Sequence, residues 1–363
     1  MKKILFIPVI VITLFSATLG QKIAKPTLTP KPLTESQSKL IQQGTALHDA
    51  KKYDEAIAKY EEVLAQNPDS SNAIYELAMT LYTKGDKVKA METANRGSKY
   101  ISDELPLLYG VMASVLDDMG KPKEAVKIYH DAIKILEGDK QFTTYLSSLH
   151  YNLGVTYVQQ KQYSEARQEL KRAVAYDFKY ASPHYLLSVV YNGTKYKVPA
   201  FLAASRFISL EYNTTRSRAA AGLIRDVLKS APKDPKTGNI NIFLNLDAPK
   251  DEGDFGMYEL FLGTLTAVKD EKDKNKTENE MFVDAIGTLI ALIDEDQKLK
   301  STFVGKNYVP FVAEMKKKGY AEVFGYMVLY VSGTESAMTW LKANDAKLGE
   351  FLAWAKAYQL PTK

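Results

Sequence analysis

A repeating pattern of small and large apolar residues limits the folds that residues 37–180 can adopt. The unit that begins at Gln37 matches one that begins at Ser71, a shift of 71 − 37 = 34 residues. Further units begin at Pro106 and Ser147, and a looser unit begins at Ala181. The shared small residues are Gly44, Ala78, Ala113 and Gly154 at one offset, and Ala56, Ala90, Ala125 and Ala166 at another.

Each unit has the pattern of two amphipathic helices joined by a tight turn. Large apolar residues three and four apart form one buried stripe per helix, and the small residues allow helix backbones to approach closely. One pair cannot bury its stripe alone, so neighbouring pairs are expected to stack into a solenoid. Tyr109 and His150 share an offset but lie 150 − 109 = 41 residues apart, which indicates a short insertion between Asp139 and Ser147.

The pattern resembles the tetratricopeptide repeat (TPR) family. The stretches that carry the resemblance include KYDEA at 52–56, YNLGVTY at 151–157 and YSEA at 163–166. The resemblance implies an all-α fold, with about five helical-hairpin repeats over residues 37–212. It also implies a scaffold that binds a partner protein or peptide, and not an enzyme.

In TPR arrays the first helix of each unit lines a concave groove, which implies a partner-binding site here. Some family members clamp a carboxylate with basic residues in this groove, but the corresponding slots hold Ile41, Tyr75 and Gly110, and we reject that clamp. An aromatic and aliphatic groove is expected instead. The alternative is that its tyrosines pack against neighbouring helices. The expected groove residues are Ile41, Tyr75, Met79, Tyr82, Tyr151, Val155, Tyr185 and Val189.

His150 and His184 occupy the same slot in consecutive units. Two imidazoles on adjacent helices can share a metal ion, but no third ligand at helical spacing is evident. The same slot carries bulky packing residues elsewhere, namely Leu40, Ile74 and Tyr109. We therefore expect core packing and no metal site.

The first residues have the layout of a secretory signal peptide. Two lysines precede an apolar run over residues 4–15, and small residues follow up to Gly20. The run is about a dozen residues long, whereas a membrane-spanning helix needs about 20. We expect residues 1–20 to be cleaved, which gives a periplasmic or extracellular protein without a lasting membrane span. The alternative is an uncleaved tether, and residues 21–36 are expected to be a proline-rich linker.

The second half is less regular. Residues 213–237 are expected to form a helix and a linker, because APKDPKTG at 231–238 breaks the helical pattern. Residues 240–247 alternate in hydrophobicity and predict one short strand with no identified partner. Otherwise residues 238–363 are expected to be mostly helical and to cap the solenoid, with a charged stretch at 269–280 that forms an exposed loop or frayed helix ends. The expected helices are Met257–Val268, Met281–Leu299, Val309–Lys318, Tyr320–Val331, Glu335–Ala343 and Asp345–Tyr358.

Composition and motifs exclude several classes of function. Cysteine is absent, which rules out disulfides, thiolate metal sites and cysteine nucleophiles. The net charge is +5, scattered along the chain, and it falls to 5 − 2 = +3 without residues 1–20, so nucleic-acid binding is not expected. No phosphate-binding loop, His-Glu-x-x-His or Gly-x-Ser-x-Gly motif occurs, and no cofactor is expected.

Three hypotheses of function follow. The favoured one is an exported scaffold, in or at a bacterial envelope, that binds a partner protein through its groove. The second is a structural component of an envelope assembly that makes its contacts through residues 238–363. A weaker third is a carboxylate-based hydrolase in the same region, since Asp and Glu pairs leave no local motif.

Overall fold

The computed structural model of this chain describes residues 23–229, 252–264 and 275–361. The predicted signal peptide (1–20) and the predicted strand (240–247) lie outside these residues. The described segments are α-helices and short 3-10 turns, with one isolated β-bridge between Leu28 and Tyr100. The predicted all-α fold is confirmed for this part of the chain. The chain divides into two compact units, unit 1 (residues 1–135) and unit 2 (residues 136–363).

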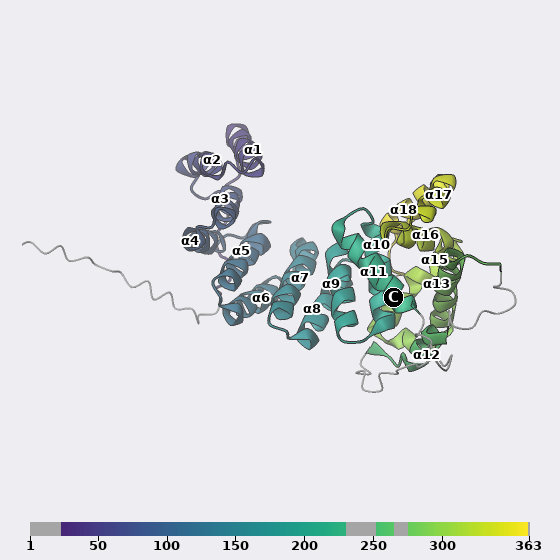
Figure 1. Ribbon diagram of the computed structural model, residues 1–363. Helices are drawn as coiled ribbons and strands as arrows, with labels where there is room; N and C mark the ends of the chain where they lie inside the picture. Colours follow the sequence, from purple (N-terminus) through teal and green to yellow (C-terminus); the bar gives the residue numbers. More distant parts are fainter. Residues whose placement is uncertain (1–22, 230–251, 265–274, 362–363) are drawn as a thin grey trace, which may run out of the picture. The chain divides into compact units, whose positions relative to one another are not determined.

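Unit 1 consists of helical hairpins stacked one on the next (Figure 1). Within each of its first two repeats the two helices pack together, and the second helix also contacts the first helix of the following repeat. First helices of successive repeats contact one another as well, so α1, α3 and α5 form a row. The helices are α1 (Glu35–Asp49), α2 (Tyr53–Gln66), α3 (Ser71–Lys84), α4 (Lys87–Gly97), α5 (Leu105–Asp118) and α6 (Pro122–Leu136), whose last residue belongs to unit 2.

At the first of the two offsets that the repeats share, the small residue allows the two helices of a hairpin to pack closely. Gly44 on α1 faces the ring of Tyr60 on α2, which is completely buried. A methyl group at Gly44 would lie 2.8 Å from Cζ of that ring and closer still to Cε1. The sequence pattern therefore reflects a steric requirement of the hairpin.

Replacing Gly44 with alanine is expected to lower the free energy of unfolding of unit 1 by about 1–2 kcal/mol, because overpacking outweighs the better helix propensity of alanine. Gly110→Ala on α5 is the matched control, since a methyl group added at Gly110 would meet no atom within 4 Å. The control should stabilise by up to about 1 kcal/mol. Thermal melts of both variants check the prediction. Equal changes in melting temperature for Gly44→Ala and Gly110→Ala would contradict it.

The predicted linker is docked along the repeats of unit 1 rather than free of them. Thr27 N and Leu28 N both donate to the Lys99 carbonyl at 3.0 Å, and Ile101 N donates to the Leu28 carbonyl at 2.8 Å. Farther along, Lys31 N donates to the Asp69 carbonyl at 3.1 Å. The chain then enters α1 through a capping box at Thr34. This segment therefore follows the connections between repeats.

Unit 2 contains two further hairpins, one more first helix and a compact C-terminal bundle. The insertion predicted between residues 139 and 147 forms a 3-10 turn and an early start of α7. Helix α13 begins at Glu278, within the stretch for which we expected an exposed loop or frayed helix ends, and Thr277 forms a capping box with Glu280 at this start. The elements are η1 (Lys140–Phe142), α7 (Thr143–Gln159), α8 (Tyr163–Tyr176), α9 (Ala181–Gly193), α10 (Lys197–Leu210), α11 (Thr215–Leu228), α12 (Gly256–Thr264), α13 (Glu278–Glu295), η4 (Leu299–Ser301), α14 (Phe303–Asn307), α15 (Val309–Lys317), α16 (Ala321–Val331), α17 (Glu335–Ala343) and α18 (Asp345–Ala357).

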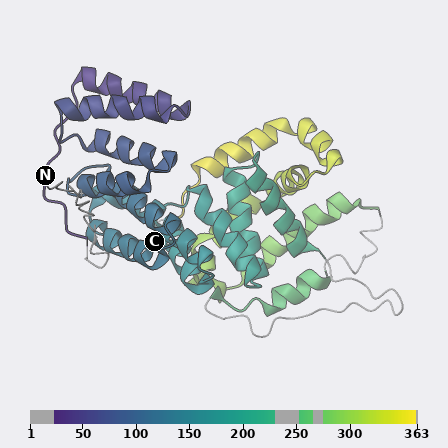
Figure 2. The ribbon, with the colours of Figure 1, turned by 60° about the vertical axis from the view of Figure 1, so that its left-hand side comes forward.

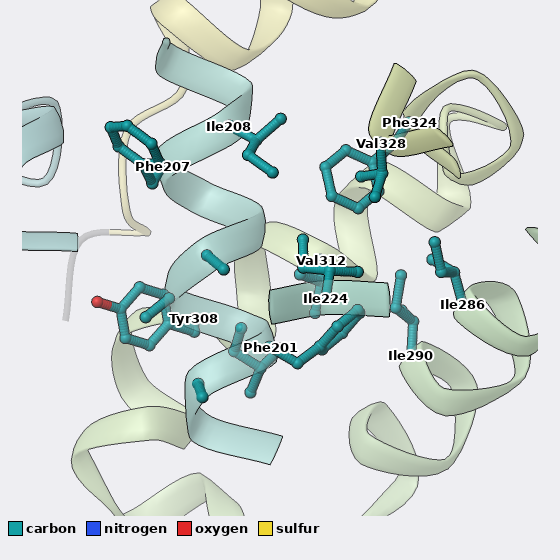
Figure 3. Packing of buried hydrophobic residues seen from close by; sticks show 14 of the residues in the cluster. Phe201, Phe207, Ile208, Ile224, Ile286, Ile290, Tyr308, Val312, Phe324 and Val328 are labelled. Atoms are coloured by element: carbon teal, nitrogen blue, oxygen red, sulfur yellow. The ribbon is translucent and has the colours of Figure 1, made fainter. Parts of the chain in front are cut away.

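One hydrophobic core joins the last hairpin of unit 2 to the C-terminal helices. Helix α10 contacts α12, α15 and α18, while α11 contacts α12, α13 and α16 (Figures 1 and 2). Figure 3 shows the side chains of Phe201 on α10, Ile224 on α11, Ile290 on α13 and Val312 on α15 in this core. The C-terminal helices therefore cover the apolar face that the final repeat would otherwise expose.

Two buried charged side chains connect the C-terminal bundle to the repeats through hydrogen bonds and ion pairs. Arg206 on α10 is completely buried, and it donates to the carbonyl of Ala355 on α18 at 2.7 Å. Glu252, also completely buried, lies 2.8 Å from Lys171 Nζ and 3.4 Å from Arg167 Nε, both on α8. The core of unit 2 thus includes polar links as well as apolar packing.

Candidate functional site

The predicted groove residues all lie on first helices of repeats, in two sets that belong to different units. Unit 1 carries one set on α1 and α3, and unit 2 carries the other on α7 and α9, which contact each other and are followed by α11 in the same row. The first set is Ile41, Tyr75, Met79 and Tyr82, and the second is Tyr151, Val155, Tyr185 and Val189.

In unit 1 these residues differ in exposure. Tyr75, Met79 and Tyr82 are half-buried, whereas Ile41 is only 8% exposed and packs into the core. Burial raises the pKa of Tyr82, and the nearby Asp118 on α5 adds to the shift. The half-buried residues of α3 therefore offer an aromatic and thioether surface with polar atoms at its edge.

Polar side chains link neighbouring first helices in unit 1. His48 Nδ1 lies 2.8 Å from Thr80 Oγ1, which joins α1 to α3. Glu104, next to the start of α5, accepts hydrogen bonds from Ser71 Oγ at 2.8 Å and from Asn72 Nδ2 at 3.3 Å. These links hold the row of first helices in register.

Carboxylates gather on the same row. The pKa of Glu76 on α3 is raised, first by burial and then by the negative charges of Asp49 and Glu104. Among the described residues Glu76 has neither a hydrogen bond nor an ion pair. Two further carboxylates therefore lie near enough to Glu76 to act on its charge.

In unit 2 the predicted tyrosines form an aromatic cluster around an arginine. Tyr151 packs edge-on against Tyr180, with ring centroids 5.5 Å apart, and Tyr185 packs against Phe207 at 5.0 Å. The guanidinium of Arg216 on α11 lies 5.7 Å from the centre of the Tyr185 ring. Val155 is half-buried and Val189 is 42% exposed. The sequence predicted the tyrosines but missed the arginine.

Extending the repeat by one more unit would have placed Arg216 in the first turn of the next first helix, although not in a groove slot. It follows Ser182 by 216 − 182 = 34 residues, and its Nη1 donates to Ser182 Oγ at 3.0 Å. Glu211 already accepts two hydrogen bonds from this guanidinium, at 2.5 and 3.2 Å, and raises its pKa. A partner carboxylate would have to compete with Glu211 for it, which fits the rejection of a carboxylate clamp.

The two histidines in the shared slot have separate partners within unit 2. His150 Nδ1 lies 2.6 Å from the buried carboxylate of Glu169, and its ring stacks on Tyr176. His184 Nε2 lies 3.0 Å from the Phe178 carbonyl, which can only accept, so Nε2 carries the proton. The other nitrogen, Nδ1, then accepts from the Tyr308 hydroxyl at 2.9 Å. Over residues 23–229, 252–264 and 275–361, no cluster of His, Asp and Glu is arranged to hold a metal.

Burial lowers the pKa of His184 to about 3, with a further contribution from the positive charge of Arg206. As the pH falls, the unfolded chain takes up a proton on this histidine near pH 6.5, but the folded chain does not. Stability should therefore fall on acidification, by about 2 kcal/mol between neutral pH and about pH 5. His184→Gln should remove this component in denaturant titrations at the two pH values. An unchanged pH dependence in the variant would contradict the prediction.

Comparison with protein families identifies the repeats. Models described as tetratricopeptide repeat match residues 47–115 and residues 147–180. The chain contains tetratricopeptide repeats. TPR families are protein-interaction scaffolds and are generally non-enzymatic. No curated protein matches this TPR chain.

Solved structures also resemble the TPR chain. Pseudomonas aeruginosa pilF is 18% identical, covers 53% of this chain and 87% of its own, and has a TM-score of 0.45. PilW, a widely conserved type IV pilus biogenesis factor, is 19% identical, with coverages of 54% and 87% and a TM-score of 0.44. A thermophilic TPR protein of Thermus thermophilus is 18% identical, with coverages of 52% and 98% and a TM-score of 0.42. Within the described residues of the TPR chain, no helix is both long and apolar enough to cross a membrane.

Proposed function

We propose that this TPR protein is an exported scaffold that binds a segment of a partner protein along the first helices of its repeats. The observation that carries the proposal is the set of half-buried Tyr75, Met79 and Tyr82 on α3, which supplies apolar contact area at low entropic cost. In unit 2, Tyr151 and Tyr185 supply a second such surface. Export is inferred from the signal-like layout of residues 1–20.

Affinity capture of the mature chain from envelope extract tests the proposal. The double variant Tyr75→Ala with Tyr151→Ala should lose a partner that the wild type captures, because each truncation removes an aromatic anchor worth about 2 kcal/mol or more at an interface. Tyr330→Ala is the matched control, since Tyr330 is 37% exposed on α16, outside the repeats. The control should retain the partner.

Circular dichroism of the same variants separates binding from folding. We expect the double variant to keep its helical signal and to melt only a few degrees lower, because both tyrosines are half-buried. Capture unchanged in the double variant would contradict the proposal and favour contacts through the C-terminal helices. Collapse of the helical signal would show instead that the tyrosines belong to the core.

A further inference from the structure

An open cavity of about 370 Å³ lies at the surface of unit 1, where residues 30–33 pass the N-terminal ends of α3 and α5. One wall is apolar and is made by Pro30, Pro32 and Leu33. The docked segment is held in place by the connection between repeats, because Asn67 Nδ2 donates to the Pro32 carbonyl at 3.3 Å. The cavity is thus a product of the folded unit and not of a loose chain end.

The polar wall of the cavity includes Ser71, Asn72 and Glu104. Glu104 accepts hydrogen bonds from both of the other side chains. An ionised carboxylate has no proton to donate, so Asn72 must turn its amide NH₂ toward Glu104. Its buried Oδ1 then has no hydrogen-bond partner within the described residues. The Glu104 carboxylate is therefore the acceptor that this wall offers to an incoming donor, since the Asn72 Oδ1 has almost no exposed surface.

No cation among the described residues of unit 1 neutralises this wall. Glu104 has no ion pair in that part of the chain. Lys31 lines the cavity, but its ammonium group lies 2.9 Å from Asp69 Oδ2 and is paired there. The charge of Glu104 also acts on Glu76 of the neighbouring tyrosine-bearing helix. A donor that enters the cavity gains most if it carries a positive charge.

We infer that this cavity receives the side chain of a lysine or arginine from the bound partner segment, and the inference rests on the proposed function. The ammonium or guanidinium group donates to the carboxylate of Glu104. The aliphatic stem lies on the prolines and Leu33, as long cationic side chains do when their heads reach a polar group. The site would thereby select partner segments with a basic residue beside apolar ones.

The test uses fluorescent apolar peptides that differ only at a central position, which is lysine, arginine, norleucine or glutamate. Fluorescence anisotropy with the full mature chain should give a dissociation constant about tenfold lower for lysine or arginine than for norleucine, the gain expected of a charge-assisted hydrogen bond. The preference should shrink as salt is added. Glutamate at this position should weaken binding below that of norleucine.

Glu104→Gln and Glu104→Leu should each abolish the preference for a basic residue, and thermal melts check that both variants fold. Glu61→Gln with Glu92→Gln is the control for charge, since both residues are exposed on second helices of unit 1. The control should keep the preference. Equal binding of the lysine and norleucine peptides, or a preference that survives in both site variants, overturns the inference but leaves the proposed function standing. Binding of every peptide unchanged in Tyr75→Ala with Tyr151→Ala overturns the proposed function itself.

Discussion

Replacing Arg206 with methionine is expected to lower the free energy of unfolding of unit 2 by about 3–5 kcal/mol. Its guanidinium is completely buried without a carboxylate partner among the described residues, and rings and carbonyls stabilise it instead. The guanidinium carbon lies 4.5 Å from the Phe178 ring centre and 4.7 Å from that of Phe311. Cation–π contacts at desolvated sites contribute about 2 kcal/mol each, and charged hydrogen bonds about 1.5–3 kcal/mol.

The position of the Ala355 carbonyl strengthens this arrangement. It lies in the last turn of α18, where backbone carbonyls lack helical partners and the helix dipole is negative. Methionine fills much of the space but leaves that carbonyl without its donor. Denaturant titration of Arg206→Met against Arg218→Met, an exposed arginine on α11, measures the effect. A more stable Arg206→Met variant would mean that the cost of burying the guanidinium exceeds these contacts.

Replacing Glu252 with alanine is expected to lower the free energy of unfolding of unit 2 by about 3–5 kcal/mol as well, the usual cost of breaking a buried ion pair from one side. The side chain is completely buried, while those of Arg167 and Lys171 are 8% and 22% exposed. Removing the carboxylate leaves two cations close together with little water.

Hydrogen exchange monitored by mass spectrometry locates this effect. We expect faster exchange in α8 and in the segment 252–255 of Glu252→Ala. Asp294→Ala, which removes an exposed carboxylate on α13, should match the wild type. Equal protection of α8 from hydrogen exchange in Glu252→Ala and Asp294→Ala would contradict a stabilising contact between Glu252 and α8.

Local patterns in the sequence were sufficient to predict most helices of the C-terminal region. The predicted range Glu335–Ala343 matches α17, and Asp345–Tyr358 differs from α18 only at its last residue. These helices have clear apolar periodicity and distinct ends. Helix α14 was missed, because five residues are too short for a helical period to be recognised.

Long-range partners could not be predicted in the same way. Arg206 appears in the sequence as one basic residue in an apolar helix, and its aromatic neighbours come from distant parts of the chain. Ile41 was expected in the groove from its position in the repeat, yet it is buried. The repeat register fixes which face of a helix a residue occupies, but not how deeply neighbouring side chains bury it.

Site-specific photo-crosslinking in the producing cell tests the central claim, binding along the first helices, most directly. A photoreactive phenylalanine derivative is placed at Met79 on α3 or at Val189 on α9, and at Val88 on α4 as the control. Val88 is 61% exposed on a second helix, so it samples solvent without belonging to either row of first helices. We predict one discrete adduct with another protein from Met79, Val189 or both, and none from Val88. Adducts of equal yield from Val88, or none from either first-helix position, would contradict a scaffold that binds through these faces.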